Sequence, residues 1–178
     1  MQGLVDVASQ VGLVFAYLFT LACYYGAFGA FLFAAWGFWR QAQPDNPFRG
    51  RPWVPPVSLF FSGLLSTFDR LLTRANATAG SGVVVSLTDA VSYTPTVSGD
   101  SLLGASPGEA VINVVELFQL FFQRFGAMAC LLAALAWYAR ETGRGERTRG
   151  SCLVQFCFGV ALINVVTVSR WLVGRFTA

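Results

Sequence analysis

The chain contains no charged residue between Val11 and Trp39. About 20 apolar residues suffice for a helix to cross the hydrocarbon core of a bilayer. Only 12% of the residues are charged, whereas soluble domains carry about 25%. Further apolar runs occupy residues 57–72, 106–138 and 152–173. The sequence therefore predicts an all-α membrane protein with four transmembrane helices.

Polar segments between the apolar runs divide the chain into three parts. Residues 73–108 are rich in Ser, Thr, Gly and Val, which favours turns and short strands, so we expect a small β-hairpin or an ordered loop there. The stretch Ser106-Pro107-Gly108-Glu109 has the pattern of a capping box that opens a helix. The predicted organisation is a first transmembrane hairpin over 1–72, an extracytoplasmic connecting segment over 73–108 and a second transmembrane hairpin over 109–178.

The two halves of the sequence align at an offset of 100 residues without a gap. The segment GAFGAFLFAAWGFWR, which ends at Arg40, falls on GAMACLLAALAWYAR, which ends at Arg140. These segments begin at Gly26 and Gly126, and further matches join Gly50 to Gly150 and Arg70 to Arg170. This internal repeat predicts a duplication, with two tandem helical hairpins in the same orientation.

Arginine is concentrated in the two polar loops that would connect the helices of each hairpin. Cytoplasmic loops of membrane proteins carry an excess of basic residues. We therefore expect both loops in the cytoplasm, with the termini and the central segment on the other side. The loop arginines are Arg40, Arg49, Arg51, Arg140, Arg144, Arg147 and Arg149. Four others oppose this orientation because they fall on the expected outer side, namely Arg70, Arg74, Arg170 and Arg175.

Small residues recur at intervals of four in the first and third apolar runs. Such spacing allows two helix backbones to approach closely. The contact can lie within one subunit or between subunits of an assembly, and the sequence leaves both interpretations open. The candidate packing residues are Ala22, Gly26, Ala30, Ala34, Gly126, Cys130 and Ala134.

The third apolar run also carries polar side chains. Ionisable residues inside a transmembrane segment usually face a bundle interior, a water-filled cavity or a partner. Glu116 and Arg124 are eight residues apart, about 12 Å along a helix, which is too far for them to pair directly. Each of them therefore needs a different partner. Intersubunit contact, pore lining and hydrogen bonding within one subunit are the alternatives. The group comprises Asn113, Glu116, Gln119, Gln123 and Arg124.

The residue inventory excludes several kinds of site. The chain has no His, which rules out histidine-based catalysis and histidine metal sites. No carboxylate pair or phosphate-binding loop suggests an enzyme. The four cysteines lack metal-ligand spacing and are expected to be buried packing residues: Cys23, Cys130, Cys152 and Cys157. No metal or cofactor is expected, and a bound phospholipid is compatible with the predicted architecture.

Residues 20–72 carry a pattern found in a known group of membrane proteins. It consists of Cys23-Tyr24-x-x-Ala27, a turn at Asp45-Asn46-Pro47, and three prolines leading into the next apolar run, Pro52, Pro55 and Pro56. This pattern resembles the IcmC/DotE and TraQ-like small membrane proteins of type IVB secretion and IncI-type conjugation systems. The second half of the chain keeps the arginines and the glycine but lacks the prolines.

The resemblance implies a structural subunit of a conjugation or secretion apparatus in the bacterial inner membrane, with its termini in the periplasm and no catalytic residues. Two apolar helices joined by a basic loop are also similar to the pilins of type IV secretion pili, whose loops face the lumen. Polymerisation would then carry the subunit into an extracellular pilus. The implied partners are copies of the same chain, other secretion or conjugation membrane components, membrane lipid, and transient single-stranded DNA or protein cargo.

Two alternatives remain open at this level. The loop arginines either face a lumen, where they would partly neutralise an anionic strand, or only set the topology. The function is either structural or that of a small oligomeric transporter or channel with a site between the repeats. The transporter is disfavoured by the small number of spans and by the expectation that the helices are unbroken near the midplane.

Overall fold

The computed structural model describes residues 2–80, 84 and 107–176. These residues form seven helices and no strand, which confirms the all-α prediction for the described part of the chain. Most of the segment 73–108, in which a small β-hairpin was expected, lies outside the described residues. Residues 73–78 of this segment are helical. The helices are α1 (Gln2–Gln41), α2 (Val54–Ser66), α3 (Phe68–Thr78), α4 (Pro107–Leu117), α5 (Gln119–Glu141), α6 (Arg149–Ile163) and α7 (Val165–Phe176).

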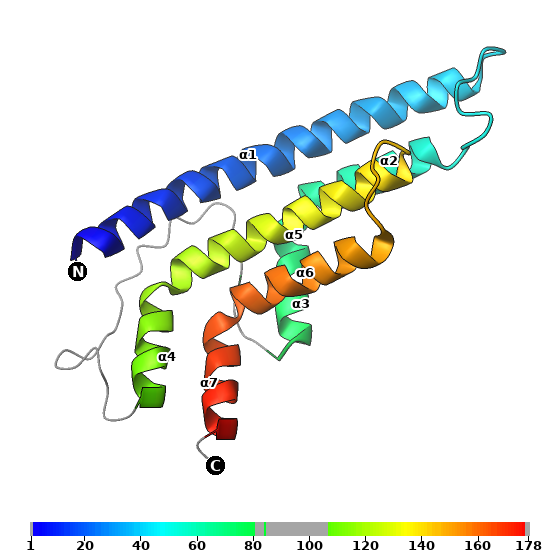
Figure 1. Cartoon of the computed structure of the whole chain (residues 1–178). Helices are drawn as coiled ribbons and strands as arrows, with labels where there is room; N and C mark the ends of the chain where they lie inside the picture. Colours follow the sequence, from blue (N-terminus) through cyan, green and yellow to red (C-terminus); the bar gives the residue numbers. More distant parts are fainter. Residues whose placement is uncertain (1, 81–83, 85–106, 177–178) are drawn as a thin grey trace.

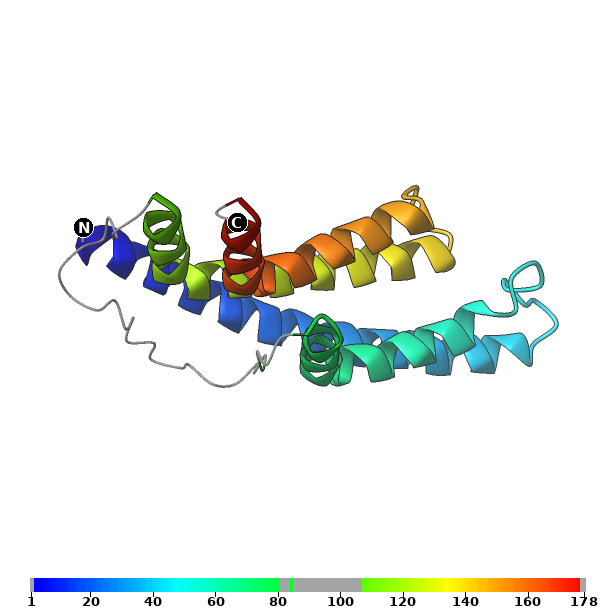
Figure 2. The ribbon, with the colours of Figure 1, turned by 90° about the horizontal axis from the view of Figure 1, so that it is seen from below.

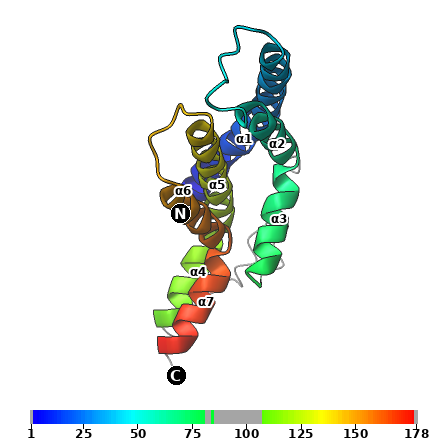
Figure 3. The ribbon, with the colours of Figure 1, turned by 90° about the vertical axis from the view of Figure 1, so that its right-hand side faces the viewer.

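Four helices run side by side and three turn away from them at one end (Figure 1). Helix α2 packs back along α1, α6 packs back along α5, and α1 contacts α5 between the two pairs. Helices α3, α4 and α7 lie across this group and are seen nearly end-on in Figure 2. Figure 3 shows that all three project from the same side of the group formed by α1, α2, α5 and α6.

Two helices are long and apolar enough to cross a membrane. They are Leu13–Gln41 within α1 and Gln119–Glu141, which is α5. Helices α6 and α7 would form a third span only as one bent pair, because they meet at 81°. Helix α2 is apolar but has only 13 residues, so it is about 20 Å long against a hydrocarbon core of about 30 Å. The fold supports a membrane location with two long spans.

Three of the apolar runs that the sequence predicted as single transmembrane helices are each divided between two helices in the structure. The breaks fall at Thr67, Phe118 and Asn164. Thr67 Oγ1 donates to the carbonyl of Gly63 at 3.0 Å, and Asn164 Nδ2 donates to the carbonyl of Val160 at 2.9 Å. Such side-chain bonds to the preceding turn often bend helices. Nothing local in the sequence explains the break at Phe118.

The core lies where α1, α5 and the ends of α2 and α6 meet. Small residues of α1 and α5 line the helix contacts, and larger residues come from all five helices of the core, such as Phe19, Leu65, Phe68, Leu131 and Ile163. The closest approach joins Gly126 of α5 to Gly159 of α6. A methyl group added at Gly126 would lie 2.6 Å from the carbonyl oxygen of Gly159. The α5–α6 crossing therefore requires glycine at this position.

Candidate functional site

The two arginine-rich loops lie at the same end of the molecule and contact each other (Figure 1). Gly143, in the loop after α5, has a φ of +78°, and a methyl group there would lie 1.6 Å from Nη1 of Arg51 in the loop after α1. In the same region, the guanidinium carbon of Arg144 lies 5.0 Å from the centroid of the Phe33 ring. The pair of helices α1 and α2 and the pair α5 and α6 are thus joined through their loops.

Most loop arginines bond within their own loop. Arg149 makes a bidentate ion pair with Glu141, with Nε–Oε1 and Nη2–Oε2 distances of 2.8 and 3.1 Å. Arg140 donates to the carbonyl of Arg147 at 2.6 Å. Arg40 donates to Gln43 and lies over the Trp36 ring. The seven loop arginines therefore lie at one end of the molecule, together with three carboxylates, Asp45, Glu141 and Glu146.

The break at Phe118 divides the polar residues of the third apolar run between two helices. Asn113 and Glu116 belong to α4, whereas Gln119, Gln123 and Arg124 belong to α5. Glu116 pairs with Arg170 of α7, which meets the expectation that its partner is not Arg124. Within the described part of the chain, the other four make no side-chain hydrogen bond or ion pair and are half-buried, so they are available to a partner or a cavity.

The Glu116–Arg170 ion pair connects α4 and α7, two of the three helices that project from the bundle. Its side chains are 24% and 64% exposed. We expect Glu116→Gln to lower the free energy of unfolding by no more than about 1 kcal/mol, as is usual for an exposed pair. Exchanging the charges, Glu116→Arg with Arg170→Glu, should restore most of the loss. Thermal denaturation in detergent measures both. Equal stability of Glu116→Gln and the exposed loop variant Asp45→Asn would show that the pair contributes nothing.

The candidate packing residues lie at contacts within one subunit. Ala30, Ala34, Gly126, Cys130 and Ala134 are buried, whereas Ala22 and Gly26 are half-buried. A methyl group on Gly26 would lie 3.3 Å from Cδ1 of Leu65, so α1 and α2 approach closely there. All four cysteines are free. Three are buried as expected, but Cys157 is exposed because it lies on the outer side of α6.

A buried pair of amides joins α3 to the break between α6 and α7, and the sequence did not predict it. Asn164 Nδ2 donates to Oδ1 of Asn76 at 3.0 Å, and the two residues are 5% and 0% exposed. Asn164 is a polar residue among apolar neighbours, and this pattern could have indicated a buried polar contact. Asn76 lay beyond the expected end of the second span, so its sequence context did not indicate one.

The arrangement offers an arginine-rich end, a set of unpaired polar groups on α4 and α5, and a polar contact at a helix break. No group of three or more His, Cys, Asp or Glu residues that could hold a metal ion occurs among the described residues. The chain matches no protein-family model, no curated protein and no solved structure.

Proposed function

We propose that the protein is a structural membrane subunit that assembles with copies of itself in a type IVB-like conjugation or secretion apparatus. The observation that carries the proposal is the exposed surface of α1. Tyr17, Tyr24 and Tyr25 are 68%, 54% and 72% exposed, and they lie inside the apolar span Leu13–Gln41. Tyrosine favours the ends of a span, and an unbonded hydroxyl in hydrocarbon is costly. A neighbouring subunit would supply hydrogen-bond partners.

The proposed subunit consists of two tandem hairpins related by a duplication. Helices α1 and α5 end at Gln41 and Glu141, which are 100 residues apart, and each is followed by a basic loop and a returning helix that breaks. In this proposal the basic loops are cytoplasmic and the breaks at Thr67 and Asn164 mark the outer interface. The bilayer is thinned around the short α2 and α6.

Placing the helix breaks at the outer interface accounts for the four arginines that opposed the predicted membrane orientation. Arg70 and Arg74 lie on α3, and Arg170 and Arg175 lie on α7. Helices that lie in the plane of the interface with basic residues on their polar side are a common arrangement. These arginines would then contact lipid headgroups rather than set the topology.

Cross-linking tests the self-assembly directly. In a Cys157→Ser background, which removes the exposed cysteine, Tyr25→Cys should give disulfide-linked dimers in oxidised membranes. Val154→Cys is the matched control, because Val154 is 67% exposed but lies on α6. Dimers from Tyr25→Cys at least several times more abundant than from Val154→Cys support the proposal. Equal yields would exclude α1 as the assembly surface.

The conjugation or secretion role is tested in the native donor cell. Deletion of the gene should abolish transfer, and expression of the chain should restore it. Immunoblotting of sheared filaments and of membranes then separates a pilin, with its loops facing the lumen, from a resident membrane component. Normal transfer by the deletion strain would contradict the proposed role.

A small oligomeric transporter or channel is the second candidate, and the broken helices favour it. Discontinuous helices often line the substrate sites of transporters, and Gln119, Gln123 and Arg124 follow the break at Phe118. Conductance measured in planar bilayers, and lost in Arg124→Gln, would favour this function. No conductance from the assembled protein would exclude a channel.

A further inference from the structure

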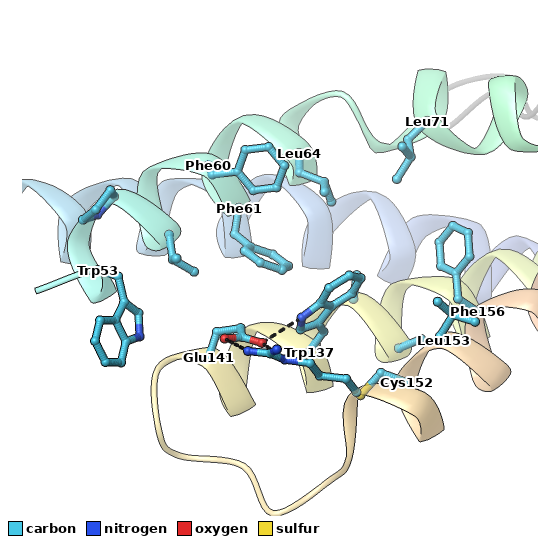
Figure 4. A pocket seen from close by; sticks show the side chains of 15 residues that line it. Trp53, Phe60, Phe61, Leu64, Leu71, Trp137, Glu141, Cys152, Leu153 and Phe156 are labelled. Atoms are coloured by element: carbon cyan, nitrogen blue, oxygen red, sulfur yellow. Dashed lines mark hydrogen bonds and ion pairs between the residues drawn. The ribbon is translucent and has the colours of Figure 1, made fainter. Parts of the chain in front are cut away.

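A long apolar groove lies between the first and second hairpins (Figure 4). Its volume is about 790 Å³, within the usual range of ligand pockets of about 300–1,000 Å³. One wall carries Phe60, Phe61 and Leu64 of α2, and the other carries Ala133 of α5 with Leu153 and Phe156 of α6. The lining is almost wholly apolar, so the groove suits a hydrocarbon chain.

The groove ends in a basic mouth at the loops. A second pocket of about 440 Å³ adjoins the groove and shares Trp53, Glu141 and Arg149 with it. Figure 4 shows Glu141 and Trp137 at this end of the groove, away from Leu71. Arg51 and Arg140 also line the mouth. Three arginines against one glutamate leave a net positive charge beside an apolar channel.

Donors remain free in this mouth. The Arg149 guanidinium is held by Glu141, but the Arg51 side chain makes no hydrogen bond or ion pair to any described residue. Arg51 is exposed and packs over Gly143, which holds it beside Arg140 and Arg149. The several N–H donors of a guanidinium group match the geometry of phosphate oxygens, so arginine binds phosphate well. Trp53 and Trp137 line the groove near this mouth, and tryptophan side chains commonly lie at the headgroup level of a membrane.

We propose that the groove binds one anionic phospholipid from the leaflet on the loop side. One of its two acyl chains lies in the groove between the hairpins, and its phosphate lies in the mouth, at Arg51 and Arg140. The positive charge of the mouth favours an anionic lipid over a helix of a second copy as the occupant. A helix in the groove would have to place a carboxylate beside the arginines of the mouth to match this charge. The inference does not depend on the proposed assembly.

Lipid binding to the purified full-length protein tests the headgroup site. Native mass spectrometry counts lipids retained from phosphatidylglycerol and from phosphatidylcholine with the same acyl chains. We expect one tightly held phosphatidylglycerol and weaker retention of phosphatidylcholine. Arg51→Gln should weaken phosphatidylglycerol binding about fivefold, the contribution of one arginine near an anionic surface. Arg49→Gln, an exposed residue of the same loop that lies outside the mouth, should leave binding unchanged.

A bulky side chain tests the groove independently. Leu153→Trp would fill it, whereas Val154→Trp changes the adjacent residue, which is also exposed but does not line the groove. Only Leu153→Trp should lose the bound lipid. Equal affinity for both headgroups, equal effects of the two arginine variants, or lipid retained by Leu153→Trp would each overturn the proposal. A lipid-free dimer that Leu153→Trp dissociates would also overturn it, because a second copy would then occupy the groove.

Discussion

Replacing Gly126 by valine should lower the free energy of unfolding by about 1–3 kcal/mol, the range for overpacking a well-packed core. A β-carbon at Gly126 would meet Gly159 O at 2.6 Å and Ile163 N at 2.9 Å. These are backbone atoms of α6, which cannot rotate away as a side chain does. Helices α5 and α6 must therefore move apart along the contact that holds the second hairpin together.

The matched control for this variant is Gly29→Val in α1. An added β-carbon at Gly29 meets no atom within 4 Å, and the residue is exposed. The thermal midpoint in detergent should fall by several degrees for Gly126→Val, because 1 kcal/mol corresponds to about 2–4 °C in a chain of this size. Gly29→Val should change little. Equal midpoints for the two variants would show that α5 and α6 are not this close.

Loss of the buried amide pair is the second large effect that we expect. Asn76→Leu or Asn164→Leu should each cost about 1–3 kcal/mol, because each removes the hydrogen bond between the two buried amides and leaves the remaining amide with one partner fewer. Because both remove the same hydrogen bond, the double variant should be more stable than the sum of the two losses predicts. The difference is the coupling energy, about 0.6 kcal/mol on average and up to about 1.7 between membrane helices.

A second cycle controls for general destabilisation. Asn113 is half-buried on α4 and has no side-chain partner among the described residues. Asn113→Leu combined with Asn76→Leu should be additive, as expected for sites without a shared partner. Chemical denaturation in mixed micelles measures all six proteins. A coupling of zero between Asn76 and Asn164 would mean that the amides do not interact.

The sequence predicted the long helices because length and hydropathy are local properties. An uncharged stretch such as Val11–Trp39 exceeds what a bilayer requires, and Arg40 lies one residue before the end of α1. The capping pattern around Pro107 likewise predicted the first residue of α4. Mean hydropathy carries no information on whether a helix continues straight, so the breaks at Thr67 and Asn164 were missed although both residues can bond back to the preceding turn.

The candidate site was predicted only as separate parts. The loop arginines were identified from their abundance, but the contact of Arg51 with Gly143 depends on how two loops 90 residues apart meet. Glu116 was expected to have a partner, but nothing in the sequence pointed to Arg170, which lies 54 residues further along the chain. The groove could not be predicted either, since its walls come from four helices whose spacing is set by glycine and alanine contacts elsewhere.

The three helices that project from one end of the bundle make the molecule unequal along its length. The loops lie at one end of α2, α5 and α6, whereas α3, α4 and α7 extend sideways from the opposite ends of these helices (Figure 1). In a bilayer with α1, α2, α5 and α6 upright, such a molecule would displace more area in one leaflet than in the other. Unequal area between leaflets produces curvature, so the protein should partition into small, strongly curved vesicles in preference to large, flat ones when α3, α4 and α7 lie in the outer leaflet.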